Sequence, residues 1–123
     1  MRAVALSLAA ICCSAIAQTT APSTFPEEAT TPTASELKER LAGRVFNVKL
    51  ADGGSLRLQY TANGYFFLNT SGGFSDTGEW RTEDGKLCYT ARKSKPGCNE
   101  MRVKAEAIYL KRHSGEVVQY VAQ

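Results

Sequence analysis

Few residues in this chain have the types and spacing that catalysis requires. His113 is the single histidine, so a Ser-His-Asp or Cys-His enzyme would have to be built on it, and Ser114 lies too close in sequence to be its partner without special geometry. Asp76 and Glu79 could form the carboxylate pair of a glycoside hydrolase, although a polar loop running into a half-exposed strand normally carries such residues. We therefore expect no catalytic residues, and a small hydrolase is the least favoured function.

Two cysteines in the second half of the chain could form either a disulfide or part of a metal site. Cys88 and Cys98 flank a Lys-Pro-Gly turn at 95–97, a spacing that lets two adjacent antiparallel strands be bridged. A metal site of Cys88, Cys98 and His113 would lack a fourth ligand and any Cys-x-x-Cys pair. We expect a Cys88–Cys98 disulfide, and neither a metal nor another cofactor.

Aromatic residues give the best candidates for ligand binding. The run at 65–68, Tyr-Phe-Phe-Leu, sends bulky groups to both faces of one strand, so half of them must pack under a helix or lie exposed. Packing under the helix at 36–41 is the favoured alternative. If they are exposed, Tyr65, Phe67 and Phe74 would suit a ligand at a mobile glycine loop, with Trp80 as a further candidate whose default role is core packing.

Basic side chains gather around the predicted disulfide hairpin and on the two strands after it. A solvated face is the usual explanation of such a cluster, and an anionic component of the cell envelope is the functional alternative. The cluster consists of Arg92, Lys93, Lys95, Arg102, Lys104, Lys111 and Arg112.

The elements that must position these residues are short strands. From Arg44 onward, seven turn signals separate apolar runs of about six residues, which predicts eight antiparallel strands in sequential order. Their predicted ranges are 44–50, 55–61, 65–70, 77–82, 86–91, 98–104, 107–112 and 116–121.

The fold class is therefore all-β, and a small up-and-down barrel of about eight strands solves the edge problem best, with a sandwich as the alternative. The barrel is wide enough for its own side chains, so we expect no large pocket, and room for a small apolar ligand only at the rim. The predicted interior aromatics are Phe46, Tyr60, Phe66, Trp80, Tyr89 and Tyr120.

Two segments precede the barrel domain at 35–123, and a short helix begins it. Residues 1–17 have a basic start, an apolar stretch and small residues before the end, which predicts a signal peptide and a periplasmic or secreted protein. Residues 18–34 are rich in threonine and proline and predict a flexible arm. Leu37 and Leu41, four residues apart before Gly43, predict a short helix with Thr33 or Ser35 as its cap, which would plug one end of the barrel.

The net charge of the chain limits the classes of molecule that we expect it to bind. Lys and Arg number 15 against 12 Asp and Glu, and removal of residues 1–17 would take away Arg2 and no acidic residue. The chain is thus nearly neutral, and with export this argues against nucleic acid as a partner. We expect a monomer whose mature form has no transmembrane segment. Its expected partner is a small apolar ligand or an envelope protein.

A sequence motif adds a resemblance. Gly78-Glu79-Trp80, followed by an Asp-Gly-Lys-Leu-Cys run at 84–88 and by Cys98, resembles small exported bacterial calycin-like domains. The resemblance covers about residues 37–121 and implies a lipocalin-like barrel of mostly unassigned activity. Lipocalins carry Gly-x-Trp on their first strand, whereas here it falls on the fourth, so the resemblance implies the barrel but no ligand site.

We predict a non-enzymatic exported binding or interaction module. The alternative is a periplasmic protease inhibitor, because exported bacterial inhibitors of metalloproteases are also eight-stranded barrels that insert an amino-terminal arm into the enzyme cleft. Residues 18–34 could act as such an arm, although the cysteine pair lies late in this barrel and early in those inhibitors.

Overall fold

The computed structural model describes residues 21–123 and consists of one helix followed by eight strands. The predicted signal peptide at 1–17 lies outside these residues. In the part of the chain that the structure describes, no helix is long and apolar enough to span a bilayer. The elements are α1 (Ala34–Leu41), β1 (Arg44–Lys49), β2 (Ser55–Tyr60), β3 (Tyr65–Thr70), β4 (Ser75–Glu83), β5 (Lys86–Ala91), β6 (Gly97–Lys104), β7 (Ala107–Lys111) and β8 (Val117–Ala122).

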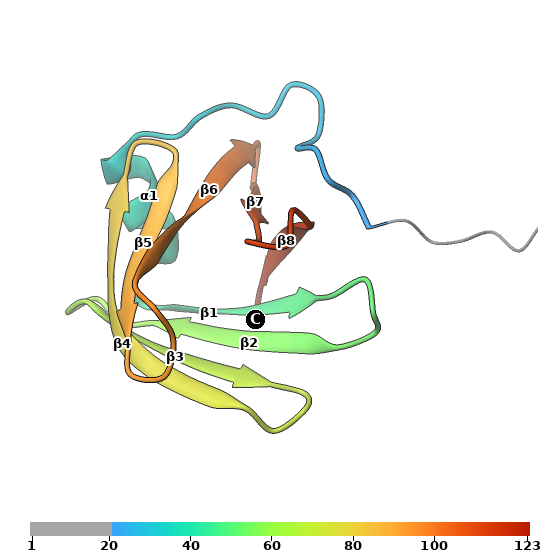
Figure 1. Ribbon diagram of the computed structural model, residues 1–123. Coiled ribbons are helices and arrows are strands. Elements are labelled where there is room, and N and C mark those ends of the chain that lie inside the picture. Colours follow the sequence, from blue (N-terminus) through green and yellow to red (C-terminus); the bar gives the residue numbers. More distant parts are fainter. Residues whose placement is uncertain (1–20) are drawn as a thin grey trace, which may run out of the picture.

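The strands form a closed antiparallel barrel in which each strand pairs with the next (Figure 1). The predicted fold class is confirmed, and the sandwich alternative is wrong. Closure occurs between β1 and β8, where Phe46 lies opposite Ala122 and Asn47 opposite Val121. This seam has two residue pairs, whereas six residue pairs join β1 to β2. A closed barrel leaves no free edge strand, which an open meander of such short strands would have.

Alternation along the strands fills the barrel with aromatic and aliphatic side chains. Phe46, Tyr60, Phe66, Trp80 and Tyr120 are all buried in the core, and Tyr89 packs against them while partly exposed. The interior aromatics predicted from the sequence are therefore confirmed.

Gly78 shows why the Gly-x-Trp motif needs its glycine. It lies opposite Ala91 where β4 approaches β5, and a Cβ atom at this position would come within 2.0 Å of the Thr90 carbonyl oxygen. That backbone cannot be displaced as a flexible side chain could, so only glycine permits the approach.

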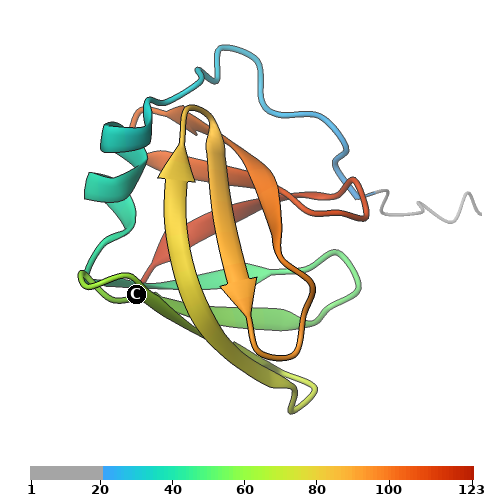
Figure 2. The ribbon, with the colours of Figure 1, turned by 60° about the vertical axis from the view of Figure 1, so that its left-hand side comes forward.

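Helix α1 covers one end of the barrel, opposite the loops at 50–54, 71–74 and 92–96 (Figure 2). The Thr33 hydroxyl caps the helix by accepting a hydrogen bond from the Glu36 backbone N–H at 3.1 Å. Leu37 and Leu41 are completely buried in the core. The predicted plug is thus present, and a helix of eight residues depends on this packing because it is too short to be stable alone.

Residues 21–33 correct the expectation of a flexible arm, because they follow a defined path over the outside of the barrel (Figure 1). Thr30 and Val103 exchange two backbone hydrogen bonds of 2.8 and 3.0 Å, and Pro32 is completely buried while its carbonyl accepts from Gly85. At the other end of the segment, the Pro22 carbonyl accepts from Val117. Composition alone missed this because the segment is held largely by backbone hydrogen bonds to the barrel, which its side-chain types do not indicate.

Candidate functional site

A cavity of about 180 Å³ lies inside the barrel between the aromatic residues near α1 and the loops at the other end. Its walls are mostly apolar, which is typical of small-molecule sites. This differs from the sequence expectation, which left room for a ligand only at the rim. The lining residues are Leu56, Leu58, Tyr60, Phe66, Leu68, Asp76, Trp80, Leu87, Tyr89, Ala91, Ser94, Asn99, Leu110 and Tyr120.

The floor of the cavity is an aromatic cluster near the helix end. The Trp80 ring meets the Tyr60 ring edge-on with centroids 5.4 Å apart, and Phe46 lies 5.3 Å from Tyr120. The Trp80 indole N–H donates to the Thr61 carbonyl at 3.1 Å, so the ring is fixed at its polar edge. Such contacts hold the rings in place, and Trp80, Tyr60 and Tyr120 among them line the cavity.

The one polar feature of this floor is a pair of phenol groups. The hydroxyl oxygens of Tyr60 and Tyr120 lie 2.9 Å apart and share a hydrogen bond in a buried setting. Burial raises the pKa of Tyr60 well above its ordinary value, and the neighbouring Tyr120 raises it further. Burial also raises the pKa of Tyr120, more than the hydrogen bond from Tyr60 lowers it. Both phenols are therefore neutral at physiological pH.

Asp76 joins the cavity wall to the loop after β5. Its carboxylate accepts hydrogen bonds from the Ser94 hydroxyl at 2.8 Å, from the Lys93 backbone N–H at 3.1 Å and from the Thr77 N–H at 2.8 Å. Burial raises the pKa of the Asp76 carboxyl, but these hydrogen bonds and the Lys93 charge lower it by more, so the pKa falls below its ordinary value. A charged carboxylate thus fixes Lys93 and Ser94 at the cavity mouth. We call these contacts the Asp76 latch.

A second polar contact lies at the loop end. The Tyr89 hydroxyl and the His113 Nε2 atom are 3.0 Å apart, in an exposed setting. Asn99 donates from Nδ2 to the Lys111 carbonyl at 3.1 Å and so keeps its amide at the wall. The mouth is therefore polar, whereas the floor is aromatic.

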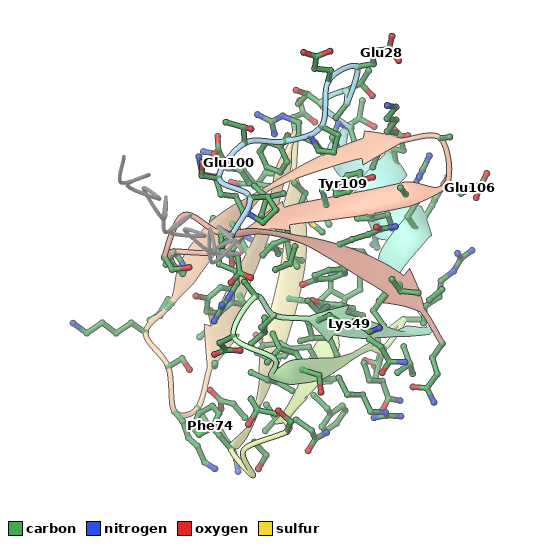
Figure 3. All side chains as sticks on the ribbon, turned by 90° about the vertical axis from the view of Figure 1, so that its right-hand side faces the viewer. Glu28, Lys49, Phe74, Glu100, Glu106 and Tyr109 are labelled. Atoms are coloured by element: carbon green, nitrogen blue, oxygen red, sulfur yellow. A yellow bond between two sulfur atoms is a disulfide. The ribbon has the colours of Figure 1, made fainter. Side chains whose placement is uncertain are left out.

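Of the four predicted ligand-binding residues, the structure places only Trp80 at the cavity. Tyr65 and Phe67 lie on the outer face of β3, 46% and 43% exposed, so the favoured alternative of burial under the helix is wrong. The reason is topological: among the described elements, α1 packs mainly against β4 and β1. Phe74 is also exposed and lies at the end of the molecule opposite Glu106 (Figure 3).

The exposed aromatics do not form one rim, because Tyr65 begins β3 near the helix end while Phe74 lies in the loop at the other end. Phe67 instead lines a separate outer depression with Arg92 and Lys93. The Lys93 ammonium lies 5.4 Å from the centre of the Phe74 ring, a cation–π contact.

The disulfide joins Cys88 to Cys98, which lie directly opposite each other on β5 and β6. A Glu83 carboxylate oxygen lies 3.1 Å from the Cys88 sulfur. Among residues 21–123, Glu83 and the two cysteines are the only three potential metal-ligating side chains that cluster, and His113 is not among them. Since the sulfurs are bonded to each other, they offer no thiolate to a metal.

The predicted basic cluster is divided into two groups. Arg102 lies 3.8 Å from Glu100 and 5.1 Å from the Phe25 ring, and Lys104 lies 3.9 Å from Glu28. These two side chains therefore bind the segment at 21–33 or its surroundings.

Around the loop end, Arg112 forms an ion pair of 2.6 Å with Glu116. Within the described residues, no ion pair involves Arg92, Lys93, Lys95 or Lys111. The members of the cluster without an ion pair thus lie around the loop end of the barrel.

The geometry of β4 argues against the carboxylate pair of the hydrolase hypothesis. Asp76 is buried and faces the barrel interior, whereas Glu79 is exposed three residues later. Their side chains are on opposite faces of the strand, because successive residues alternate. The two carboxylates cannot flank one glycosidic bond in this arrangement.

Sequence reasoning missed the Asp76 latch and the tyrosine pair as functional features. Tyr60 and Tyr120 could have been placed inside by alternation alone, but their contact joins residues 60 positions apart on strands that flank β1. Asp76 was noticed only as a partner for Glu79. Nothing in the local sequence indicates that Ser94, 18 residues later, binds it.

No protein-family model, curated protein or solved structure matches this chain. The resemblance to calycin-like domains is thus supported at the level of barrel architecture, by eight antiparallel strands in sequential order.

Proposed function

We propose that this protein is a non-enzymatic binding module, exported to the periplasm or beyond, that holds a small one-ring apolar molecule inside its barrel. The observation that carries the proposal is the cavity of about 180 Å³ with aromatic and aliphatic walls. In another protein, an apolar cavity of about 150 Å³ binds benzene. Pockets for drug-sized ligands are larger, roughly 300–1,000 Å³, so the size favours one ring.

Export is supported by the Cys88–Cys98 disulfide, because disulfides persist in oxidising compartments and are rare in the cytosol. The alternative of protease inhibition would require residues 22–33 to leave the barrel, breaking the Thr30–Val103 and Pro32–Gly85 hydrogen bonds. A partner protein could instead meet the exposed Phe67 and Phe74. The cavity gives the ligand proposal the more specific support.

The test is a titration of the isotope-labelled protein with toluene, monitored by NMR. Trp80 is the single tryptophan, so its indole N–H gives one signal that reports on the cavity. We expect this signal to shift in a saturable manner. Ala91 lines the cavity, and Ala91→Phe should fill it and abolish the shift.

The matched control is Thr90→Phe, which adds a ring to the exposed neighbouring position on β5 and should leave binding unchanged. Unchanged Trp80 signals with toluene would contradict the proposal. Native mass spectrometry of protein from its own envelope fraction would then show whether a protein partner is retained instead.

A further inference from the structure

The hydroxyl pair of Tyr60 and Tyr120 has one more hydrogen-bond donor than the protein uses. Two phenols carry two protons, and their mutual hydrogen bond of 2.9 Å uses one of them. Within residues 21–123, this is the only hydrogen bond to either hydroxyl. Both residues line the cavity, so the second proton can be offered there.

A buried O–H group without an acceptor is unfavourable, since it loses its hydration without replacement. A ligand that brings an acceptor atom to the cavity floor removes this cost. A purely hydrocarbon ligand of the same shape leaves the cost in place. The pair therefore discriminates between two ligands that fill the cavity equally well.

The charge of the site restricts the ligand further. Burial raises the pKa values of both phenols, so the pair remains a neutral donor. The Asp76 carboxylate lines the same cavity and has a lowered pKa, so it is charged at neutral pH and repels anions. Among the described residues, no basic side chain lines the cavity to balance an anionic ligand.

We propose that the cavity selects a neutral aromatic molecule with one oxygen acceptor, such as an aryl ketone, aldehyde or ether. The oxygen accepts from the Tyr60–Tyr120 pair, and the ring packs against Trp80 and Phe66. This inference rests on the proposed function, because it names the ligand class of the same cavity.

Two ligands of the same shape test it: acetophenone, and α-methylstyrene, in which a CH₂ group replaces the oxygen. We expect acetophenone to bind about fivefold to tenfold more tightly, as one net hydrogen bond predicts. Benzoate, which carries the same ring and a negative charge, should bind at least tenfold more weakly than acetophenone. The Trp80 indole signal serves as the readout for all three.

Variants assign the preference to the hydroxyl pair. In the double variant Tyr60→Phe/Tyr120→Phe, the two neutral ligands should bind equally. Either single variant keeps one hydroxyl and should keep the preference, and Tyr65→Phe on the outer face is the matched control.

The outcomes separate this inference from the proposed function. Equal binding of acetophenone and α-methylstyrene to the unaltered protein would overturn the inference while leaving the proposed function intact. Tightest binding of benzoate, or a preference that survives in the double variant, would also overturn it. Binding of none of the probes would overturn both.

Discussion

The helix end and the loop end of this barrel are closed by different interactions. At the helix end, Leu37 and Leu41 are completely buried, and the Thr82 hydroxyl donates to the Ala34 carbonyl at 2.7 Å. At the loop end, the Asp76 latch consists of part-buried hydrogen bonds, and the Tyr89–His113 contact is an exposed one. Apolar packing closes one end, and polar contacts close the other.

This contrast has a consequence for ligand exchange. Opening the helix end exposes apolar surface to water, which costs roughly 25 cal/mol for each Å². Opening the loop end exchanges protein hydrogen bonds for water hydrogen bonds, whose net value is only about 1 kcal/mol each. Local opening should therefore occur at the loop end, where the cavity mouth lies.

The largest expected change in the free energy of unfolding comes from Leu37→Ala, which removes apolar packing at the helix end. The completely buried leucine leaves a cavity in the core, so the free energy of unfolding should fall by about 2–5 kcal/mol. Guanidinium denaturation measures this loss. The exposed Lys38→Ala on the same helix is the control, and similar losses for both variants would show that α1 does not close the barrel.

Alkaline pH should weaken the same end through its tyrosine pair. The folded pKa values of Tyr60 and Tyr120 are raised, so their contribution is fully present below the unfolded value of about 10 and is lost as pH rises. By pH 11 we expect a loss of roughly 1 kcal/mol for each tyrosine.

Denaturation at pH 9 and pH 11 tests this expectation. The double variant Tyr60→Phe/Tyr120→Phe should lose less stability over that interval than the unaltered protein. Equal losses would mean that the two phenols ionise in the folded barrel.

A smaller effect is expected from Asp76→Ala, which removes the latch at the loop end. Loss of its hydrogen bonds should lower the free energy of unfolding by about 1–2 kcal/mol and accelerate exchange of the Lys93 backbone amide, which donates to this carboxylate. The exposed Glu79→Ala on the same strand is the control. Slow exchange that persists in Asp76→Ala would exclude the carboxylate as the group that fixes the loop.

The latch also has a pH dependence of known sign. Because the folded pKa of Asp76 is lowered, its stabilising contribution is present above the unfolded value of about 3.9 and is lost as pH falls through the lower folded pKa. The Lys93 amide signal should therefore titrate below that value. In Asp76→Ala this titration should disappear.

The smallest change in the free energy of unfolding is expected from His113→Ala. Its contact with Tyr89 is exposed, so the loss of stability should be about 1 kcal/mol or less. Ligand exchange should nevertheless become faster, as measured from NMR line shapes with acetophenone. A large loss of stability with unchanged exchange would place His113 in the structural core rather than at the mouth.

The sequence by itself determined where the strands lie and which of their side chains face the barrel interior. The predicted ranges 65–70 and 86–91 match β3 and β5, and the other six strands differ by one or two residues at their ends. Turn chemistry and alternation are local properties, so they can be read without knowing the fold. The disulfide was also predictable, because its cysteines flank one short turn.

Tertiary structure alone decided which aromatic side chains line the cavity. Tyr65 and Phe67 were placed on one face by alternation, but only the position of α1 against β4 and β1 showed that this face is exposed. Likewise, barrel closure beside β1 brings the Tyr60 hydroxyl to Tyr120, and the path of the loop after β5 brings Ser94 to Asp76. These contacts depend on how distant strands are placed in space, a property that no local pattern of residues specifies.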